Sequence, residues 1–266
     1  MAKVNTYSQL IEKIFLAHFR PGLEDFVFER LEIERAASEL RVRVPKNLGD
    51  LVYNFRYRRD FPESVKASAP RGKEWVILPA GRGRCRFVAT ALANILPNLR
   101  LTYTKVPDAT PGLVEMYALT DEQALLAKLR YNRLIDVFTS LSCYSLQSHL
   151  RTTIPDIGQV ETDERYVGID RRGAHYILPV QAKGGRDRLS VVQVAQDFSL
   201  CAARFPSLLA RPLAAQFIER NLIALFEFEQ NASGVAVAAE RHYQLVPPDQ
   251  LTEEDIRAYS QRLADQ

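Results

Sequence analysis

The chain has 266 residues, of which 47% are hydrophobic and 25% charged, and its formal net charge is +3. This composition is that of an ordinary soluble globular protein with one large domain or two smaller ones. We expect a cytoplasmic protein, because no apolar run is long enough to span a bilayer and the N-terminus lacks a signal-peptide pattern. The three cysteines are widely spaced and odd in number, which argues against both a disulfide framework and structural zinc.

The positive charge is concentrated near the N-terminus. The segment from Arg41 to Arg86 contains 12 Lys or Arg and 4 Asp or Glu, a local balance of +8 that leaves −5 for the rest of the chain. A basic region joined to a mildly acidic one indicates one part that holds a polyanion and another that holds a metal ion. A solvated charged surface is the plainer interpretation of the same cluster.

Three helices are predicted in the N-terminal region. Apolar residues at helical spacing predict the first over Tyr7–His18, and we expect a second near Glu32–Leu40 and a third near Asn47–Arg59. The second and third are joined by a short connection that ends at Pro45, which is compatible with a helix-turn-helix. The residues of this region that we expect to contact DNA are Arg41, Arg43, Lys46, Arg56, Arg58 and Arg59.

A β-hairpin tipped by glycines and arginines is predicted next. Its strands are Glu74–Leu78 and Cys85–Val88. Three helices followed by such a hairpin resemble a winged helix, with the segment Gly81–Arg86 as the wing. Glycine lets the tip approach a phosphate backbone, and arginine supplies planar, multi-donor contacts. The wing residues expected to contact DNA are Arg82, Arg84 and Arg86. A helical cap with a basic surface is the alternative.

A stretch punctuated by prolines, from Pro97 to Gly112, separates two halves of the sequence. We therefore expect a DNA-binding domain over residues 1–105 and a second domain over residues 106–266. The second half begins with a capping box, in which Thr120 is the N-cap and Gln123 the third helical residue. This pattern predicts one helix that continues to about Leu141.

A second β-hairpin is predicted further along the chain. Two β-rich runs, Tyr166–Ile169 and His175–Val180, flank a turn that contains glycine and is centred near Arg172. Asp170 lies at the turn, where we expect it to form the turn rather than to bind a ligand.

This hairpin predicts a cluster of four polar side chains. Antiparallel strands folded about Arg172 place Asp163 opposite Gln181 and Glu161 opposite Lys183. Because side chains alternate between the faces of a strand, all four point the same way. An ordinary surface hairpin, with Glu161 and Lys183 as a cross-strand ion pair, is the plainer interpretation.

This pattern resembles the PD-(D/E)XK nuclease superfamily, in which an acid on one strand and an (Asp/Glu)-x-Lys on the next bind a divalent metal. The tripeptide Gln181-Ala182-Lys183 has glutamine where most members have an acid, and is similar to the Mrr-type branch and some type II restriction enzymes. The resemblance covers roughly residues 120–205. It implies Mg²⁺-dependent cleavage of double-stranded DNA, with Mn²⁺ as a substitute, in a restriction or host-defence role.

The chemistry accounts for the residue types. Phosphodiester hydrolysis needs charge neutralisation at the scissile phosphate and an activated water, and a carboxylate-held Mg²⁺ supplies both. Asp163 would be the main metal ligand, Gln181 would offer an amide oxygen, and Lys183 would orient or activate the water. The glutamine removes one negative charge, so metal should bind more weakly unless Glu161 also serves as a ligand.

Helices are expected on both sides of this hairpin. In the superfamily the preceding helix can carry an acid toward the metal, and the candidates here are Glu122 and Asp136. A capping box beginning at Ser190 predicts a following helix to Phe205, from which Gln196 or Asp197 can approach the site. Two further strands and a C-terminal helix are expected at Ile223–Glu229, Val235–Leu245 and Glu253–Leu263.

We therefore predict an α+β protein with an N-terminal winged-helix-like domain and a C-terminal restriction-endonuclease-like mixed sheet flanked by helices. Cutting both strands with one site per chain favours a homodimer. A non-catalytic DNA-binding regulator with a degenerate nuclease fold is the competing interpretation, and Gln181 keeps it open. A structure-specific repair or RNA-processing nuclease would share the same chemistry.

Overall fold

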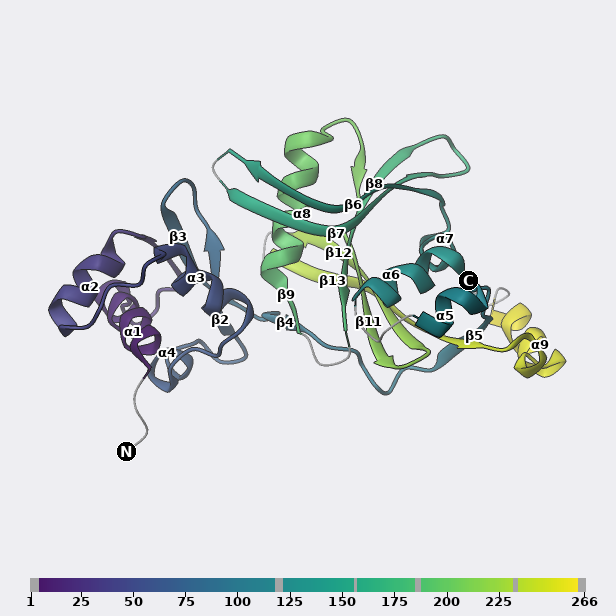
Figure 1. The fold of residues 1–266 in the computed structure, drawn as a ribbon, viewed down its shortest axis with the longest axis horizontal. Coiled ribbons are helices and arrows are strands. Elements are labelled where there is room, and N and C mark those ends of the chain that lie inside the picture. The colour runs from purple at the N-terminus through teal and green to yellow at the C-terminus, as the bar shows by residue number, and fades with distance from the viewer. Residues whose placement is uncertain (1–4, 118–121, 156, 185–187, 232–233, 263–266) are drawn as a thin grey trace.

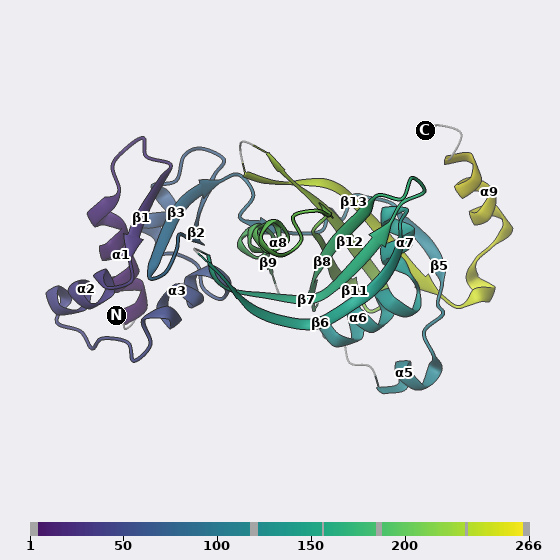
Figure 2. The same cartoon turned by 90° about the horizontal axis from the view of Figure 1, so that it is seen from above.

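The computed structural model describes residues 5–117, 122–155, 157–184, 188–231 and 234–262. Helices and strands both contribute, and the largest sheet is mixed, so the α+β class is confirmed. The molecule is elongated, with the N-terminal part at one end and helix α9 (Glu253–Arg262) at the other (Figures 1 and 2). Within the described ranges, no helix combines the length and apolar character needed to cross a membrane.

The N-terminal part contains an antiparallel sheet with the strand order β1-β3-β2, against which helices pack. The predicted helices correspond to α1, α2 and α3, and the predicted hairpin to β2 and β3. No local pattern predicts β1 or α4. In chain order the elements are α1 (Thr6–His18), β1 (Asp25–Glu29), α2 (Glu32–Leu40), α3 (Leu48–Tyr57), α4 (Glu63–Ala67), β2 (Glu74–Pro79) and β3 (Arg84–Thr90).

Local signals explain why these elements form. Helix α1 begins after Asn5, whose side chain accepts a hydrogen bond from the backbone N–H of Tyr7. Its apolar stripe is fully buried, and Phe15 packs edge-on against Phe87 of β3, with ring centroids 5.1 Å apart. Asn47 caps α3 in the same way as Asn5 caps α1. This core joins all the helices of the N-terminal part to its sheet.

The larger, C-terminal part follows after a short connection. Its first elements are β4 (Asn94–Ile95), β5 (Tyr103–Pro107), α5 (Gly112–Tyr117), α6 (Glu122–Tyr131), α7 (Leu134–Thr139), β6 (Ser142–Ile154), β7 (Gly158–Ile169) and β8 (His175–Lys183). The elements after these are β9 (Leu189–Ser190), α8 (Val191–Arg204), β10 (Leu209–Ala210), β11 (Leu213–Glu219), β12 (Leu222–Asn231), β13 (Gly234–Val246), η1 (Pro248–Gln250) and α9.

One 8-stranded sheet organises this part, with the order β5-β13-β12-β11-β8-β7-β6 and with β10 beside β8. Strands β6, β7 and β8 form an antiparallel meander. Helix α8 then leads to β11, which runs parallel to β8. Strand β5 pairs with β13, so the expected domain boundary between residues 105 and 106 falls inside a strand of this sheet.

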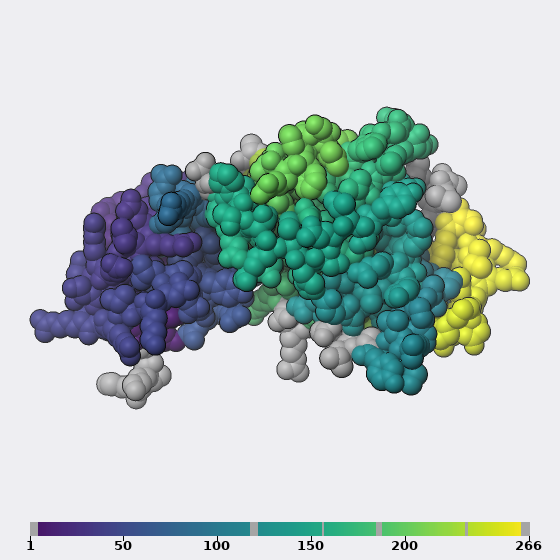
Figure 3. All heavy atoms as spheres, turned by 45° about the horizontal axis from the view of Figure 1, so that its top comes forward, coloured from purple at the N-terminus to yellow at the C-terminus, as the bar shows by residue number. Residues whose placement is uncertain are grey.

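Helices cover both faces of the sheet. Leu125 and Leu129 of α6 pack with Leu178 of β8 on one face. Val194 of α8 packs with Ala214 and other apolar residues on the opposite face. That second cluster also includes residues of β2, so the N-terminal part and the larger part share an apolar contact. Figure 3 shows the outer surfaces of the two parts lying against each other.

The prediction of one helix between residues 120 and 141 is wrong in one respect, because this segment forms two helices, α6 and α7. Helix α6 ends at Tyr131, and Arg133 has a left-handed backbone conformation with φ 49°. The buried Asn132 donates hydrogen bonds to Asp108 and Thr110, which anchors the break to a distant segment. The proposed N-cap at residue 120 lies outside the described residues. The helix expected after the second hairpin is confirmed as α8, and its capping box at Ser190 is present.

Candidate functional site

The candidate site lies on the predicted second hairpin. Strands β7 and β8 pair with Glu164 opposite Val180, which is the register expected when the hairpin folds about Arg172. At the turn, Asp170 accepts hydrogen bonds from the backbone N–H groups of Arg172 and Ala174, and the bond from Ala174 contributes most to lowering the pKa of its carboxyl. Asp170 therefore stabilises the turn, as expected.

The two strands separate at the open end of the hairpin, beyond Glu164. There the backbone N–H of Ala182 donates to Asp163 Oδ2 at 2.8 Å, where a regular ladder would use a carbonyl. Thr162 bonds to α8 whereas Glu164 bonds to α6, so two residues that strict alternation would place on one face point to opposite faces. The Asp163 carboxylate consequently lies at the break in the ladder.

Gln181 is held by three hydrogen bonds and is only 1% exposed. Its Nε2 donates to the Glu161 carbonyl at 3.1 Å and to Asp197 Oδ2 at 2.8 Å. Its Oε1 accepts from Gln193 Nε2 at 3.2 Å. Because Nε2 faces two acceptors and Oε1 faces a donor, the orientation of the amide is fixed.

Asp197 supports this arrangement from α8 and is completely buried. Thr162 Oγ1 donates to its Oδ1 at 2.6 Å, and Gln181 donates to its other oxygen. Burial raises the pKa of Asp197 to about 7, against the effect of these two donors, and the nearby Asp163 raises it further. Asp197 therefore contacts the site through Gln181.

Glu161 and Lys183, which the plainer interpretation pairs with each other across the strands, each lie near a different charged residue. Lys183 is 16% exposed, and its Nζ lies 3.9 Å from Glu122 Oε1 at the start of α6. Glu161 instead lies 3.7 Å from Arg151 of β6, and both of those side chains are more than half exposed. The acid near Lys183 is thus Glu122, one of the two helix acids that the resemblance offers as candidates to approach the metal. The other, Asp136, bonds to Arg133 and to the backbone of Cys143.

A cleft with a volume of about 680 Å³ brings these residues together with the N-terminal part. We call its two sides the hairpin wall and the helix wall. The hairpin wall consists of the lining residues of β6, β7, β8 and α8 together with Glu122, and it includes Glu161, Asp163, Gln181 and Lys183. The helix wall consists of the lining residues of α3 together with its neighbours Asn47, Arg58 and Arg30. The side chains predicted to hold metal therefore face cationic side chains across one space.

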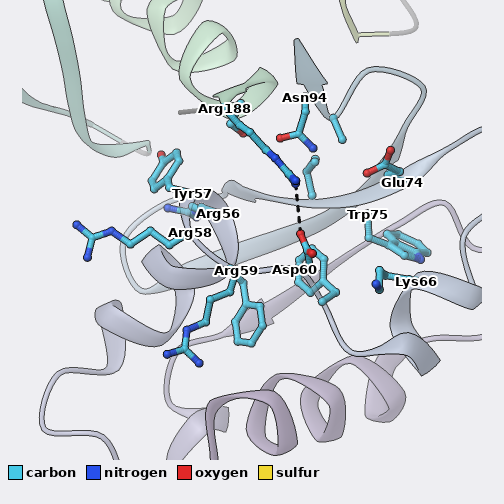
Figure 4. A pocket seen from close by; sticks show the side chains of 15 residues that line it. Arg56, Tyr57, Arg58, Arg59, Asp60, Lys66, Glu74, Trp75, Asn94 and Arg188 are labelled. Atoms are coloured by element: carbon cyan, nitrogen blue, oxygen red, sulfur yellow. Dashed lines mark ion pairs between the residues drawn. The ribbon is translucent and has the colours of Figure 1, made fainter. Parts of the chain in front are cut away.

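Two side-chain contacts join the N-terminal part to the larger part beside this cleft. Tyr57 Oη donates to Gln196 Oε1 at 3.0 Å, and burial raises the pKa of Tyr57. Arg188 lies 3.6 Å from Asp60 and reaches it across a neighbouring pocket of about 530 Å³ (Figure 4). Arg58 and Arg59 point away from that pocket in the same view, toward solvent.

The side chains predicted to bind DNA fall into three groups: two line the cleft, one is paired with an acid, and the others are exposed outside the cleft. Arg56 and Arg58 line the cleft. Arg56 donates to the Ile77 carbonyl at 2.8 Å and burial lowers its pKa, so this arginine connects α3 to β2 rather than offering a free guanidinium. Arg86 is paired with Asp25 at 2.5 Å. The exposed cations outside the cleft are Arg41, Arg43, Lys46, Arg59, Arg82 and Arg84.

No protein-family model, curated protein or solved structure matches this chain. The geometry of the site is therefore the basis for a functional argument.

The hairpin wall offers few carboxylates for a metal. Within the described ranges, no group of three or more His, Cys, Asp or Glu side chains could hold an ion. Mg²⁺ in proteins commonly takes one or two carboxylates and completes its shell with substrate phosphates and water. Asp163, with neutral oxygens from Gln181 and the Ala182 carbonyl nearby, fits such a substrate-completed site. These groups do not fit a site in which protein ligands alone complete the coordination of the ion.

Sequence reasoning missed several residues that line the cleft. Arg30 follows β1, and its Nε is buried with no hydrogen-bond partner among the described residues. Arg188 precedes α8 and lines both pockets. Neither belongs to a recognisable local motif, and only the packing of the two parts brings them to the site.

Proposed function

We propose that this chain is a Mg²⁺-dependent endonuclease that hydrolyses phosphodiester bonds in double-stranded DNA. One observation carries the proposal: Asp163, Gln181 and Lys183 meet at the open end of one hairpin and face cationic side chains across a single cleft. A phosphate in that cleft would lie within reach of both a metal-binding carboxylate and strand-binding cations.

The topology of the larger part supports the proposal. The meander β6-β7-β8 is preceded by α6 and followed by α8 and by β11, which is parallel to β8. The PD-(D/E)XK resemblance calls for a mixed sheet flanked by helices, with an acid on one strand of the hairpin and the x-Lys motif on the next. Asp163 on β7 and Lys183 on β8 fit that pattern.

The N-terminal part supports a DNA-binding role. Its order of helix, strand, three helices and hairpin, with the sheet order β1-β3-β2, is similar to the winged helix that the sequence resembles. In that interpretation the β2–β3 tip would be the wing. Gly81 and Gly83 at the tip have positive φ values of 105° and 74°, which glycine adopts at little cost.

The residues divide the chemistry between them. A bound Mg²⁺ would neutralise phosphate charge and make a coordinated water more acidic. Asp163 would hold it through Oδ1, which receives no hydrogen bond from the described residues, while Oδ2 stays fixed to Ala182. Lys183 would position the attacking water and offset negative charge on the phosphate. Gln181 would contribute the second lone pair of Oε1.

The direct test is cleavage of methylated and unmethylated genomic DNA by the purified protein with Mg²⁺ or Mn²⁺. We expect Asp163→Asn and Lys183→Met each to reduce the cleavage rate by about 10²- to 10⁴-fold, the range for removal of a positioned catalytic group. DNA binding measured without metal should stay within threefold for both variants. Wild-type protein that shifts these DNAs on a gel yet leaves them intact would refute the proposal.

The second carboxylate can be identified by a matched pair of variants. Glu122 lies near Lys183, whereas the exposed Glu161 is paired with Arg151. We expect Glu122→Gln to slow cleavage about tenfold, as for loss of a group that supports a metal site. Glu161→Gln should change the rate less than threefold, because exposed ion pairs contribute little. The opposite order of effects would make Glu161 the assisting ligand.

A DNA-binding regulator with a degenerate nuclease fold is the second candidate. The observation that favours it is Gln181, whose amide nitrogen and oxygen already have protein partners. Binding without cleavage in the genomic DNA assay would support this candidate. For the enzyme, cutting both strands further calls for a homodimer, which light scattering of the DNA-bound protein would detect.

A further inference from the structure

The helix wall carries an ordered stack of aromatic and cationic groups. The Arg58 guanidinium carbon lies 5.0 Å from the centre of the Tyr53 ring. The Tyr53 ring in turn lies 5.0 Å from the Tyr57 ring, at an interplanar angle of 64°. Tyr57 is anchored to Gln196 by its hydroxyl, so the stack has a fixed end at the larger part and an exposed end at Arg58.

Tyr53 is the member of this stack that has room for a ligand. Its side chain is 43% exposed, although tyrosine is a large, largely apolar residue, and it lines the cleft that contains Asp163 and Lys183. Aromatic rings that remain open in a cationic groove are the usual platform on which unpaired nucleobases stack. An adjacent arginine strengthens such stacking through cation–π attraction.

The size of the cleft restricts what can reach this platform. A volume of about 680 Å³ is within the range of pockets that hold one small molecule. One or two extruded nucleotides fit such a volume, which favours a local unpaired segment of one strand over an intact duplex as its occupant.

Arg30 adds a phosphate-binding group to the same wall. Its Nε is buried and has no hydrogen-bond partner among the described residues, although guanidinium N–H groups in proteins are usually satisfied. The Arg30 guanidinium lines the cleft, and its terminal N–H groups would donate to a strand phosphate there with the charge-assisted geometry that arginine favours. A base on Tyr53 and a phosphate at Arg30 would be parts of one bound strand.

We propose that the helix wall binds unpaired nucleotides next to the scissile phosphate, so that the substrate is duplex DNA carrying a short unpaired segment. Tyr53 stacks the base, Arg58 and Arg30 hold the strand, and Asp163 and Lys183 lie across the cleft. The cleavage step rests on the proposed nuclease function, whereas the binding step does not. The exposed wing arginines would hold the flanking duplex outside the cleft.

The binding step is tested without metal, by fluorescence anisotropy of labelled DNA in EDTA. The probes are a perfect duplex and the same duplex with a three-nucleotide bubble. We expect wild type to bind the bubble at least fivefold more tightly. Tyr53→Ala should weaken bubble binding about 5- to 100-fold, because stacking contributes about 1–3 kcal/mol per base. Its affinity for the perfect duplex should change less than twofold.

Two control variants separate stacking from a loss of structure. Tyr53→Phe keeps the ring and should retain the bubble preference. Tyr131→Ala removes a tyrosine of α6 that is 46% exposed and does not line the cleft, and it should behave as wild type. Equal affinity of wild type for bubble and duplex, or normal bubble binding by Tyr53→Ala, would overturn the proposal.

Cleavage assays with Mg²⁺ distinguish this proposal from the proposed function. Faster cutting of the bubble than of the duplex, with the difference lost in Tyr53→Ala, supports both. Tyr53-dependent bubble binding with no cutting of any DNA supports the platform and refutes the nuclease. Equal cutting and equal binding of both substrates refute the platform and leave the nuclease standing.

Discussion

The two walls of the cleft are built in different ways. On the hairpin wall, Asp163 is bonded to a backbone N–H, and Gln181 has three partners, one of them the buried Asp197. On the helix wall, Arg58 rests on a tyrosine ring and is exposed to solvent. Fixed partners set the geometry that chemistry requires, whereas long exposed side chains can adjust to a bound strand.

Because of this difference, substitutions on the two walls should affect different properties: the stability of the fold on the hairpin wall and the affinity for a ligand on the helix wall. Changes on the hairpin wall leave buried polar groups without partners, so they should destabilise the fold as well as the site. Changes to exposed cations remove contacts made mostly to ligand and water, so they should alter binding and leave the fold intact. The predictions below test this separation.

The largest effect is expected at Asp197, the buried support of the hairpin wall. Asp197→Leu removes the acceptor for both Gln181 and Thr162, and leaves two buried donors unsatisfied. We expect the free energy of unfolding to fall by about 2–4 kcal/mol, since each unsatisfied buried group costs roughly 1–3 kcal/mol and the added apolar burial offsets part of this. Urea denaturation at pH 8 measures the loss.

Asp197→Asn is the matched control for this change. Its amide oxygen can accept from Gln181 while its amide nitrogen donates to the Thr162 hydroxyl, which can also accept. The network is then preserved, and the variant should unfold within about 1 kcal/mol of wild type at neutral pH. Equal losses for the leucine and asparagine variants would mean that the hydrogen-bond network is not what stabilises this wall.

A smaller effect is expected from pH. Burial raises the pKa of Asp197 to about 7, from an ordinary value of 3.8. Between these values the unfolded chain loses the proton and the folded protein keeps it, so the contribution of this group to stability falls as pH rises and is lost above about pH 7. The asparagine variant cannot ionise there, so its melting temperature relative to wild type should increase from pH 5 to pH 8.

Taking the difference between the two proteins removes the contributions of other titrating groups. The charged groups that act on Asp197 besides its bonded partners are Asp163, which raises its pKa, and Arg165, which lowers it, and both remain in the variant. A difference that stays constant between pH 5 and pH 8 would contradict the raised pKa.

Much of the fold was predictable because its signals are local. Helix α1 follows from its apolar spacing and helix α8 from its capping box, and the second hairpin follows from its turn. The break between α6 and α7 was not predictable, because Asn132 is held by Asp108 and Thr110, more than twenty residues earlier in the chain. Strand β6 was also missed, because its central residues are exposed on both faces and show no alternation of apolar and polar positions.

The candidate site likewise has one part that the sequence predicts and one part that it does not. The turn sets the register of the paired part of the hairpin, and Asp163, Gln181 and Lys183 line one cleft where the strands separate just beyond it. The helix wall could not be placed opposite them from sequence. Its contact with the hairpin wall runs through Tyr57 and Gln196, which are 139 residues apart. Contacts of that range arise from packing of separate elements, which single-sequence patterns do not encode.

The smallest effect is expected at the tip of the β2–β3 hairpin, away from both walls. The exposed Arg82 and Arg84 are the proposed phosphate contacts, whereas Arg86 is already paired with Asp25. We expect Arg82→Gln and Arg84→Gln each to weaken duplex binding a fewfold and to reduce the slope of log K against log salt by about 0.9, the contribution of one phosphate contact.

Arg86→Gln is the internal control for that experiment, because it removes the same charge from the same hairpin. Its guanidinium is held by Asp25, so forming a phosphate contact would require that ion pair to be given up. The salt slope should therefore change by well under half of the effect at Arg82. Equal slopes for all three variants and wild type would exclude the hairpin tip from the DNA interface.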